Sequence, residues 1–422
     1  MPELKEVVVV DGVRTPIGKS GWKAASGGKK PGILFNSTAH EMLKTVIERL
    51  VENVKTKSSA FNSAEIEDVA IGCSAQYGEQ AANLGRIAVL LAENIPDNDV
   101  PGKTIDRYCN AGLEAINSEA QAIMCGNGEI AIAGGIEFMS KYPLGSSLNA
   151  TIINGRKHIF HRQFMKKQNI MGMSAEMVAE KYGLTREDLD DFGALSQKKA
   201  VLAMRDIEWY KKRIAPVTIV EKIEGKRVKN TYNKDETPRE EFANNFEVAR
   251  EKMKTLKPRF KPKGGIVTAG NSSAIVDGAA AVMLMSQEKA DELSIKPMAK
   301  ILSCAVAASE PRIMLLGPIP AQKKALRRAG NLRMDDMDII EPNEAFASPC
   351  LAFAKEFGYA FDDPRVNPTG GGISLGHPIG ASGVIYFLEM VWEMVKKNHR
   401  YGIQTLCGGG GVGIATVVER EK

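Results

Sequence analysis

Three side chains suited to nucleophilic and acid–base chemistry each lie beside a glycine-rich turn. Cys109 stands just before a helical pattern, His377 lies in the glycine-rich stretch 370–383, and Cys407 precedes the glycines of 408–411. A thiol attacks as the thiolate, and a helix N-terminus or a nearby imidazole lowers its pKa. Free backbone N–H groups of a glycine turn can stabilise an oxyanion. Together these residues predict acyl transfer, with a nucleophilic thiol, a base and a second proton-transfer group.

Each of these residues also has an ordinary structural interpretation. A cysteine on its own is most often a small buried apolar side chain, and a histidine in a glycine-rich turn can be incidental. Two cysteines and one histidine, all next to glycine turns, are harder to explain as core packing. The functional interpretation requires that these turns, which lie far apart in the sequence, meet in the fold.

The elements around the turns fall into two similar series. The first has strand patterns at 7–10, 69–72 and 130–133, the last closing on Gly134 and Gly135, and helical patterns at 39–54, 85–92 and after Cys109. The second has strand patterns at 299–305, 338–340 and 402–406 and helical patterns at 321–329 and 384–397. Such alternation predicts a parallel sheet covered by helices. The repetition predicts two like halves facing each other, with equivalent loops that bring Cys109 towards His377 and Cys407.

The middle of the chain, residues 142–273, departs from this plan and is expected to be an insertion over the face where the loops converge. From residue 141 to residue 175 it has basic but no acidic side chains, and the basic ones are Lys141, Arg156, Lys157, Arg162, Lys166 and Lys167. A solvated surface loop explains such a stretch. A clamp for a phosphorylated ligand explains it as well, because Lys and Arg supply charge-assisted donors to phosphate.

Composition excludes several classes of function. The 422 residues are 44% hydrophobic with a net charge of +5, typical of a globular protein of two or three domains. The sequence lacks the clustered basic patch of a nucleic-acid-binding protein and the apolar run of ~20 residues that spans a membrane. No signal-peptide pattern opens the chain, and the six cysteines form no Cys-x-x-Cys pair. We therefore expect a cytoplasmic protein with reduced thiols and without nucleic-acid, membrane or metal partners.

Five ordered motifs make the sequence similar to the thiolases, the enzymes that cleave or form the carbon–carbon bond of 3-ketoacyl-CoA. The similarity runs from residue 7 to the C-terminus. The motifs are 171–176 (Met-Gly-Met-Ser-Ala-Glu), 268–273 (Thr-Ala-Gly-Asn-Ser-Ser), 343–347 (Asn-Glu-Ala-Phe-Ala), 376–383 (Gly-His-Pro-Ile-Gly-Ala-Ser-Gly) and 407–411 (Cys-Gly-Gly-Gly-Gly).

The resemblance implies an α/β, thiolase-like fold in which two similar α/β halves form a five-layer αβαβα sandwich with an inserted loop domain. Residues 1–139, completed by 274–298, would form the N-terminal half, and residues 299–422 the C-terminal half. Residues 140–273 would form the inserted domain, of the kind that binds CoA and contributes to tetramers. A homodimer or homotetramer is expected.

The resemblance also assigns roles to individual residues. Cys109 would accept the acyl group, His377 would take its proton and donate to the thioester oxygen, and Cys407 would be the general acid and base. Asn343 would hold a water in a first oxyanion hole, and the N–H groups of Cys109 and Gly409 would form a second. The residues expected to contact substrate or CoA are Ser273 near the pantetheine, Arg239 near the adenine, and Met171, Phe346 and Met314.

The implied activity is thiolysis of 3-ketoacyl-CoA to acetyl-CoA and a shortened acyl-CoA, or the reverse Claisen condensation, by a ping-pong route. Acyl-CoA, acetyl-CoA and CoA would be substrates, and no permanently bound cofactor is expected. An acetoacetyl-CoA thiolase working in the synthetic direction shares every catalytic residue and stays open as an alternative. Related condensing synthases typically carry histidine where Asn343 stands. A non-catalytic CoA-binding scaffold subunit would not need Cys109, His377 and Cys407 intact.

Four departures from the family pattern lie near the expected pocket or in the stretch before Ile170. Asn110 and Ala111 follow the nucleophile where serine or another small residue is usual, and Leu315 replaces a glycine. Ile170 stands where members tuned to acetoacetyl-CoA carry histidine, and the preceding excursion is shorter than theirs. The last two differences favour a 3-ketoacyl-CoA thiolase of broader or degradative type.

Overall fold

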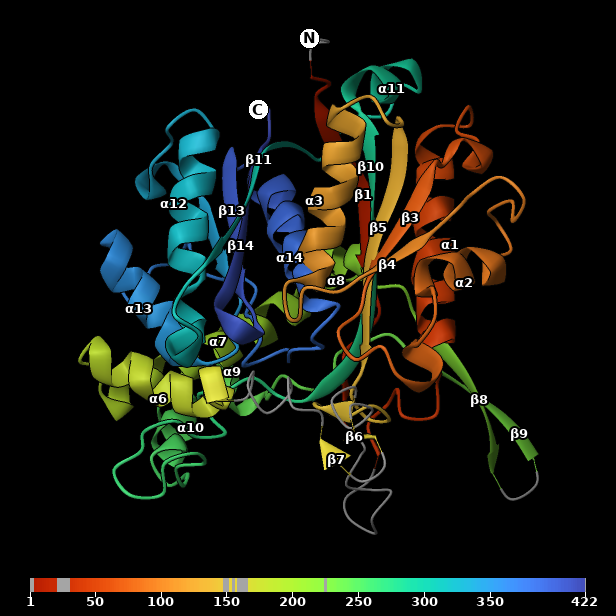
Figure 1. Ribbon diagram of the computed structural model, residues 1–422. Coiled ribbons are helices and arrows are strands. Elements are labelled where there is room, and N and C mark those ends of the chain that lie inside the picture. The colour runs from red at the N-terminus through yellow and green to blue at the C-terminus, as the bar shows by residue number, and fades with distance from the viewer. Residues whose placement is uncertain are drawn as a thin grey trace.

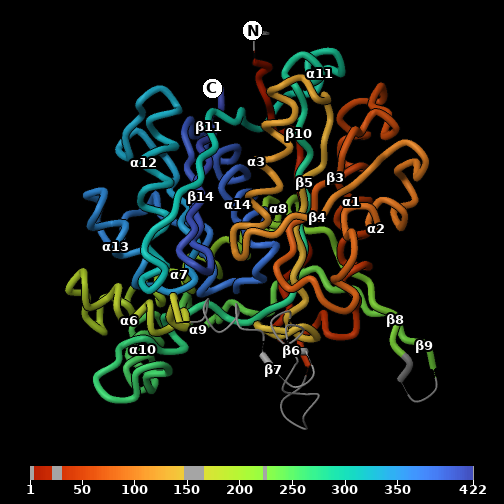
Figure 2. Tube along the Cα trace, in the orientation of Figure 1, coloured from red at the N-terminus to blue at the C-terminus, as the bar shows by residue number. Residues whose placement is uncertain are grey.

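The apolar strand β1 (Val7–Arg14) lies in the middle of the sheet, with every residue buried. It belongs to a computed structural model that describes residues 4–20, 31–146, 166–223 and 226–421, with the backbone of 152–153 and 156–157. The start of β1 and the end of the last strand lie at the same end of the molecule (Figure 2).

Helices cover both faces of the N-terminal sheet. Its elements are β1, the short β2 (Gly18–Lys19), α1 (Ala39–Lys57), β3 (Asp68–Gly72), α2 (Leu84–Leu91), β4 (Lys103–Ile105), α3 (Ala111–Met124), β5 (Ile130–Phe138) and β10 (Val276–Ser286). Thr38 and Glu41 form a capping box that starts α1, and apolar side chains at helical spacing bury the inner face of that helix. Helices α1 and α2 pack on one face of the sheet, and α3 packs on the other.

The C-terminal half repeats this order of elements. After α11 (Gln287–Glu292) come β11 (Ala299–Ala308), α12 (Pro318–Arg328), β12 (Ile339–Pro342), α13 (Ala347–Phe357), α14 (Ser382–Lys397), β13 (Tyr401–Cys407) and β14 (Val412–Glu419). The strand order across the molecule is β12-β13-β14-β11-β1-β10-β5-β3-β4. Strands β1 and β11 pair only at Val8 and Val9, so this short contact joins the N-terminal sheet to the C-terminal sheet.

Helices α3 and α14 lie between the two sheets, and α14 is therefore buried on almost every side (Figure 1). Helices α12 and α13 cover the outer face of the C-terminal sheet. The layers are α1 and α2, the N-terminal sheet, α3 and α14, the C-terminal sheet, and α12 and α13. The five-layer αβαβα arrangement implied by the resemblance is confirmed.

Two local expectations are wrong. The sheet is mixed: β3–β4, β3–β5 and β12–β13 are parallel, and the other pairs are antiparallel. The glycine turn after Cys407 is too short for a crossover, so β13 and β14 must pair antiparallel. Gly134 and Gly135 also do not end β5, which continues to Phe138. A Cβ on Gly135 would lie 2.5 Å from the Gly380 carbonyl oxygen, so the glycine admits the turn before α14.

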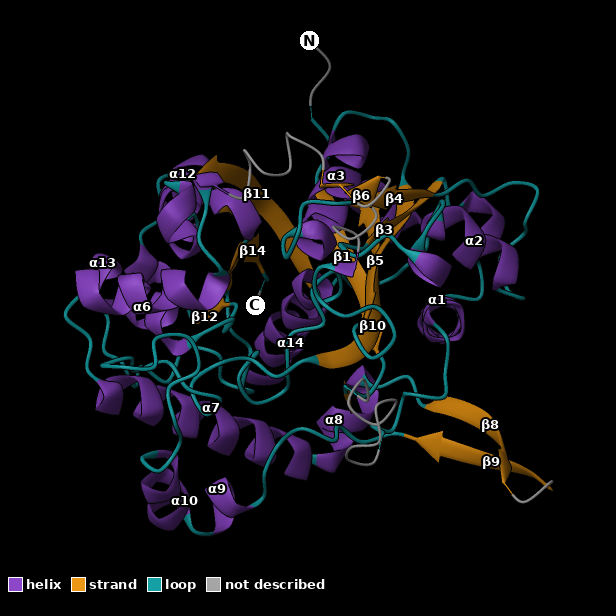
Figure 3. Cartoon of the chain, turned by 60° about the horizontal axis from the view of Figure 1, so that its bottom comes forward, coloured by secondary structure: helices purple, strands orange, loops and turns teal. Residues whose placement is uncertain are grey.

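The described part of the insertion contains helices and two short antiparallel strand pairs, and it lies at the end of the molecule where α3 and α14 begin (Figure 1). Its elements are β6 (Ile152–Ile153), β7 (Arg156–Lys157), α6 (Met171–Lys181), α7 (Arg186–Arg205), α8 (Ile207–Arg213), β8 (Val217–Ile223), β9 (Lys226–Tyr232), α9 (Glu241–Asn244) and α10 (Phe246–Met253). Helices α6 and α7 pack on α13, and the β8–β9 hairpin extends away from the body (Figure 3).

Candidate active site

Cys109 lies in the turn between β4 and α3, two residues before the helix begins. Tyr108 before it has a φ of 52°, and its N–H donates at 2.7 Å to the Asp106 carboxylate. This left-handed conformation is costly for a residue other than glycine, and the Asp106 hydrogen bond helps to hold it. The Cys109 side chain is 3% exposed and packs against Met139 and Ile379.

Cys407, at the end of β13, meets the Cys109 turn from the opposite half. The Asn110 side-chain nitrogen donates to the carbonyl oxygens of Cys407 and Leu406 at 3.0 and 3.2 Å, in the amide orientation that satisfies these groups. Cys407 is 2% exposed and lies near enough for its charge to raise the pKa of Cys109. The fold therefore brings the two thiols, one from each half, to one place.

His377 is oriented by Ser382, on the first turn of α14. The ring Nδ1 lies 2.6 Å from Ser382 Oγ, and this hydroxyl donates at 2.9 Å to the carbonyl of Pro378. Because the serine proton is used on Pro378, Nδ1 carries the imidazole proton and Nε2 is left basic. Gly376, with φ 110°, precedes the histidine, and the Tyr386 hydroxyl donates to its carbonyl. The turn is thus held at both ends.

Asn343 lies beside the basic nitrogen of His377. Its Nδ2 is 3.4 Å from His377 Nε2, and its Oδ1 accepts no hydrogen bond from any described residue, although Asn343 is 4% exposed. The next residue, Glu344, accepts from Asn367 Nδ2 at 2.7 Å and from the Ile373 N–H at 3.1 Å. These bonds tie the Asn343 segment to the glycine-rich turn that carries His377.

Burial sets the protonation states of the three reactive groups. It raises the pKa of Cys109 well above its usual range, and nearby Cys407 and Glu137 raise this pKa further. It raises the pKa of Cys407 to about 12 and lowers the pKa of His377 to about 4. The expected lowering of the pKa of Cys109 is therefore wrong for the free protein. The resting site holds two thiols and a neutral imidazole, and within the described chain no hydrogen bond joins Cys109 to His377.

Two backbone N–H groups near the thiols are free. Within the part of the chain that the structure describes, neither Cys109 N–H nor Gly409 N–H donates a hydrogen bond, whereas the neighbouring Gly410 N–H donates to Gln168 Oε1 at 3.1 Å. Met171, also from the insertion, packs against the cluster around Cys109. The insertion thus supplies one residue to the glycine turn and one to the apolar wall of the site.

Comparison with known proteins agrees with this geometry. The family model for the thiolase N-terminal domain matches residues 7–288, and that for the thiolase C-terminal domain matches residues 295–420. The chain belongs to the thiolase family.

Named thiolases resemble the chain over its whole length. It is 38% identical to "Acetyl-CoA acetyltransferase" of Syntrophomonas wolfei, over 98% of this chain and 99% of that protein. It is 37% identical to "3-ketoacyl-CoA thiolase" of Klebsiella pneumoniae, over 99% and 100%. The crystal structure of the Bacillus anthracis acetyl-CoA acetyltransferase superposes with a TM-score of 0.83 at 34% identity and covers 99% of this chain and 100% of that one.

The other residues expected to contact substrate lie at different distances from the thiolase centre. Met314 and Phe346 are buried in the core cluster that contains Cys407. The Ser273 N–H donates at 3.0 Å to Ala345, which places this serine beside Phe346. Arg239 is exposed, and its backbone N–H donates to Gln197, so no described contact brings it to the thiols or to His377.

The basic stretch of the insertion lies partly outside the described residues. Arg162 and the side chains of Arg156 and Lys157 fall there, and the phosphate clamp stays a prediction. Lys166 and Lys167 are exposed. Lys141 is already engaged, because its ammonium group donates to the Ser37 carbonyl at 2.9 Å and lies 4.8 Å from the centre of the Phe138 ring.

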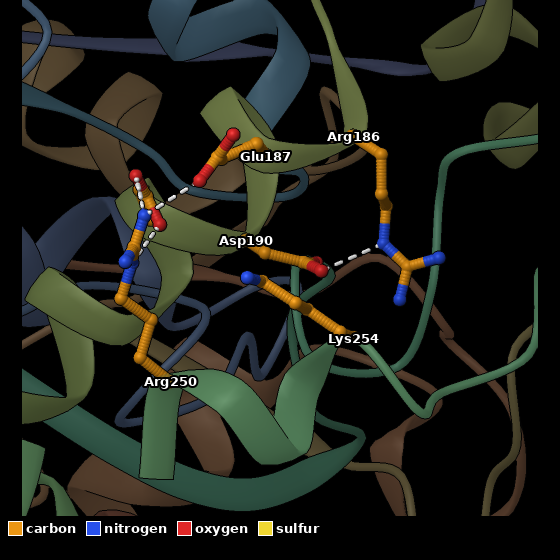
Figure 4. Close-up of a pocket in the computed structure, with 6 residues that line it drawn as sticks. Arg186, Glu187, Asp190, Arg250 and Lys254 are labelled. Atoms are coloured by element: carbon orange, nitrogen blue, oxygen red, sulfur yellow. Dashed lines mark hydrogen bonds and ion pairs between the residues drawn. The ribbon is translucent and has the colours of Figure 1, made fainter. Parts of the chain in front are cut away.

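A cavity of about 190 Å³ lies on the insertion and contains none of the predicted site residues (Figure 4). It is lined by Arg186, Glu187, Asp190, Asp191, Arg250 and Lys254. Both guanidinium groups are already paired, Arg186 with Asp190 and Arg250 with Asp191 and Glu187. Among the described residues, no three His, Cys, Asp or Glu side chains could together hold a metal ion, and no helix is long and apolar enough to cross a membrane.

Sequence reasoning missed three residues of this thiolase site. Ser382 lies inside the motif 376–383, and a hydroxyl five residues after the histidine, at the helix start, is a signal that could have found it. Glu137 is a carboxylate in an otherwise apolar strand, and a buried charge needs partners. Gln168 has no comparable signal in the sequence.

Proposed function

We propose that this thiolase cleaves 3-ketoacyl-CoA with CoA to give acetyl-CoA and a shortened acyl-CoA, and also runs the reverse condensation, through an acyl-enzyme on Cys109. The observation that supports this best is the meeting of two buried thiols, one from each half, with a basic imidazole nitrogen and unpaired backbone N–H groups. Relatives named for both activities match the chain from end to end.

Cleavage begins when Cys109 loses its proton and attacks the 3-keto carbon. His377 accepts that proton at Nε2, because its Nδ1 proton is engaged with Ser382. The C2–C3 bond then breaks, and Cys407 protonates C2 of the departing enolate to release acetyl-CoA. In the second half, the Cys407 thiolate takes the proton of the CoA thiol. The CoA thiolate attacks the acyl-enzyme, and Cys109 leaves and recovers its proton from His377.

The enolate and the tetrahedral intermediate need separate donors. Asn343 and His377, side by side at 3.4 Å, suit the enolate oxygen of the acetyl-CoA thioester, with Asn343 acting through a bound water as in the family. The free N–H groups of Cys109 and Gly409 suit the oxyanion of the acyl-transfer step. Fixed donors in a site that excludes water stabilise such charges far better than bulk solvent does.

We assign CoA binding to the insertion, residues 140–273, with Ser273 at the pantetheine and Arg239 at the adenine. Residues 1–139 with 274–298 and residues 299–422 are the two halves that carry the chemistry. CoA esters are the substrates, and no permanently bound cofactor takes part. A homodimer or homotetramer in the cytoplasm fits the family and the six unpaired cysteines.

The acyl-chain preference separates two candidate roles. Ile170 and the short excursion before it favour a degradative enzyme of broader chain length. A synthetic acetoacetyl-CoA thiolase is the second candidate, favoured by the name of the S. wolfei relative.

Thiolysis rates for 3-ketoacyl-CoA esters of increasing chain length decide between these roles. We expect higher kcat/KM for longer esters than for acetoacetyl-CoA, and a preference for the four-carbon ester would establish the second role. Iodoacetamide should label Cys109 at one equivalent, and prior incubation with acetyl-CoA should block this labelling. Absence of thiolysis with every ester, together with unselective thiol labelling, would overturn the proposed function in favour of a scaffold subunit.

A further inference from the structure

Glu137 is a buried carboxylate in β5 that binds the turn before α14. It is 1% exposed. Its Oε2 accepts from the Gly380 N–H at 2.9 Å and from the Ser74 N–H at 3.1 Å, and its Oε1 accepts from the Ala75 N–H at 3.1 Å and from Gln80 Nε2 at 3.0 Å. One side chain of the N-terminal half therefore holds a turn of the C-terminal half, three residues after His377.

The shell around Glu137 consists of donors. Three backbone N–H groups and one side-chain NH2 group point at the carboxylate, and none of these groups can accept a hydrogen bond from a protonated carboxyl. Gln80 is fixed in this role, because its Oε1 accepts from the Phe138 N–H at 2.6 Å and its Nε2 also donates to the Ala75 carbonyl at 2.8 Å. The shell favours the ionised form of Glu137 and opposes the effect of burial, which raises the pKa of this carboxyl.

The turn held by Glu137 fits its site closely. A Cβ on Gly380 would lie 2.5 Å from the Ile136 carbonyl oxygen and 2.7 Å from the Cys73 Cα. The turn is therefore tightly packed at Gly380, and the Gly380 N–H donates to the carboxylate. The same turn carries Ile379, which packs on Cys109. A displacement at Gly380 would reach both His377 and the nucleophile.

The charge of Glu137 also acts on the nucleophile. The titratable groups that raise the pKa of Cys109 are Cys407, Glu137 and Asp106. A carboxylate near a thiol opposes formation of the thiolate, because the two negative charges repel. Glu137 also raises the pKa of Cys73, a buried thiol outside the proposed mechanism.

We propose that Glu137 is a positioning residue for the thiolase reaction: its carboxylate anchors Gly380, and thereby holds His377 and Ile379 against Cys109 across the boundary between the halves. Glu137 does not touch the reacting atoms in this role. Its negative charge adds to burial and to Cys407 in raising the pKa of Cys109. The kinetic part of this proposal rests on the proposed thiolysis, and the electrostatic part does not.

Two substitutions of Glu137 separate the effect of its hydrogen bond to Gly380 from the effect of its charge on Cys109. Glu137→Gln keeps the shape but places an NH2 group against N–H donors and removes the charge. We expect kcat for thiolysis to fall by about tenfold to 100-fold with KM nearly unchanged. The pH profile of Cys109 alkylation by iodoacetamide should also shift to lower pH by at least about 0.5 unit. Glu137→Asp keeps the charge but withdraws it from Gly380, so kcat should fall while the alkylation profile stays in place.

Glu119→Gln is the matched control, because Glu119 is buried on α3 and paired with Lys103 at 2.6 Å. It should change neither readout. The proposal is overturned if Glu137→Gln retains both wild-type kcat and the wild-type alkylation profile, or if Glu119→Gln gives the same changes. If Glu137→Gln does not fold, Glu137→Asp decides, and wild-type kcat in that variant refutes the positioning role. If the wild type shows no thiolysis, the proposed function fails, and the alkylation profile still tests the effect of charge.

Discussion

The two halves of this thiolase share the order of their strands and helices but carry different side chains at corresponding positions. Glu137 pairs with Gly278 across β5 and β10, and Cys407 pairs with Gly413 across β13 and β14, at corresponding positions of the two sheets. The parallel strand pairs support this correspondence. The last pair of β3–β5 is Gly72–Gly135, and the last pair of β12–β13 is Pro342–Thr405. Glu137 and Cys407 each lie two residues after these pairs. The end of one strand thus holds a hydrogen-bonded carboxylate, and the end of its counterpart holds a candidate reactive thiol.

The turns before the central helices show the same division. Cys109 and Gly380 each lie two residues before a central helix, α3 and α14 respectively. Each turn contacts the strand end of the opposite half, through Asn110 on the Cys407 carbonyl and through the Gly380 N–H on Glu137. In each pair of corresponding positions, one member is a candidate reactive thiol and the other takes part in a contact between the halves. A duplicated scaffold thus brings equivalent positions together, while the side chains decide the function.

The largest effect should come from removing Cys109, the candidate thiol in the turns before the central helices. Cys109→Ser should lower kcat for acetoacetyl-CoA thiolysis by about 10⁴-fold, because a serine hydroxyl is a much weaker nucleophile than a thiolate. CoA binding, measured by calorimetry, should persist. Cys125→Ser, which changes an exposed cysteine, is the control and should retain activity. Turnover of Cys109→Ser near the wild-type rate would place the nucleophile elsewhere.

Removal of Cys407, the candidate thiol at the strand ends, should block cleavage of the carbon–carbon bond. Cys407→Ala should still form an acyl-enzyme from labelled acetyl-CoA, because the CoA thiolate is a far weaker base than an enolate carbon and can leave without the proton that Cys407 supplies in the wild type. Thiolysis of acetoacetyl-CoA should fall by about 10³-fold. Cys304→Ala, in β11 of the same half, serves as the control. A variant that fails to become labelled would show that the two thiols do not divide the work in this way.

The His377 turn should make stability depend on pH. Its pKa falls from 6.5 to about 4 on burial, so between these values the unfolded chain binds a proton that the folded chain rejects. This residue should therefore lower the free energy of unfolding by about 3 kcal/mol as the pH falls from 6.5 to 4. Urea unfolding of wild type and His377→Asn at several pH values isolates the contribution. Parallel curves for the two proteins would contradict it.

The smallest effect should come from the structural contact of the Cys109 turn. Asn110→Ala leaves the carbonyls of Cys407 and Leu406 without their side-chain donor. We expect a loss of about 1–3 kcal/mol in the free energy of unfolding. Asn127→Ala, at an exposed position beyond α3, should cost much less. Equal losses in the two variants would show that Asn110 does not join the halves.

Much of the fold follows from local patterns. The apolar runs of β1 and β3 and the helical spacing of α1 and α14 are visible in the sequence, and the repetition of the plan indicates two halves. The mixed pairing of the sheet is less visible, because parallel and antiparallel strands can carry the same buried apolar pattern. The glycines of β5 misled for a related reason, since Gly135 serves close packing against Gly380 rather than a turn.

The sequence by itself determined the motifs, the two-part plan and the candidate reactive side chains, because periodicity, turn chemistry and residue type are local properties. The tertiary structure decided which strand ends and turns face each other, that Ser382 fixes the His377 tautomer, and that Glu137 reaches Gly380. It also decided the protonation states, because desolvation depends on the packing of both halves around Cys109. Those contacts join segments far apart in the chain, and local sequence patterns do not indicate such contacts.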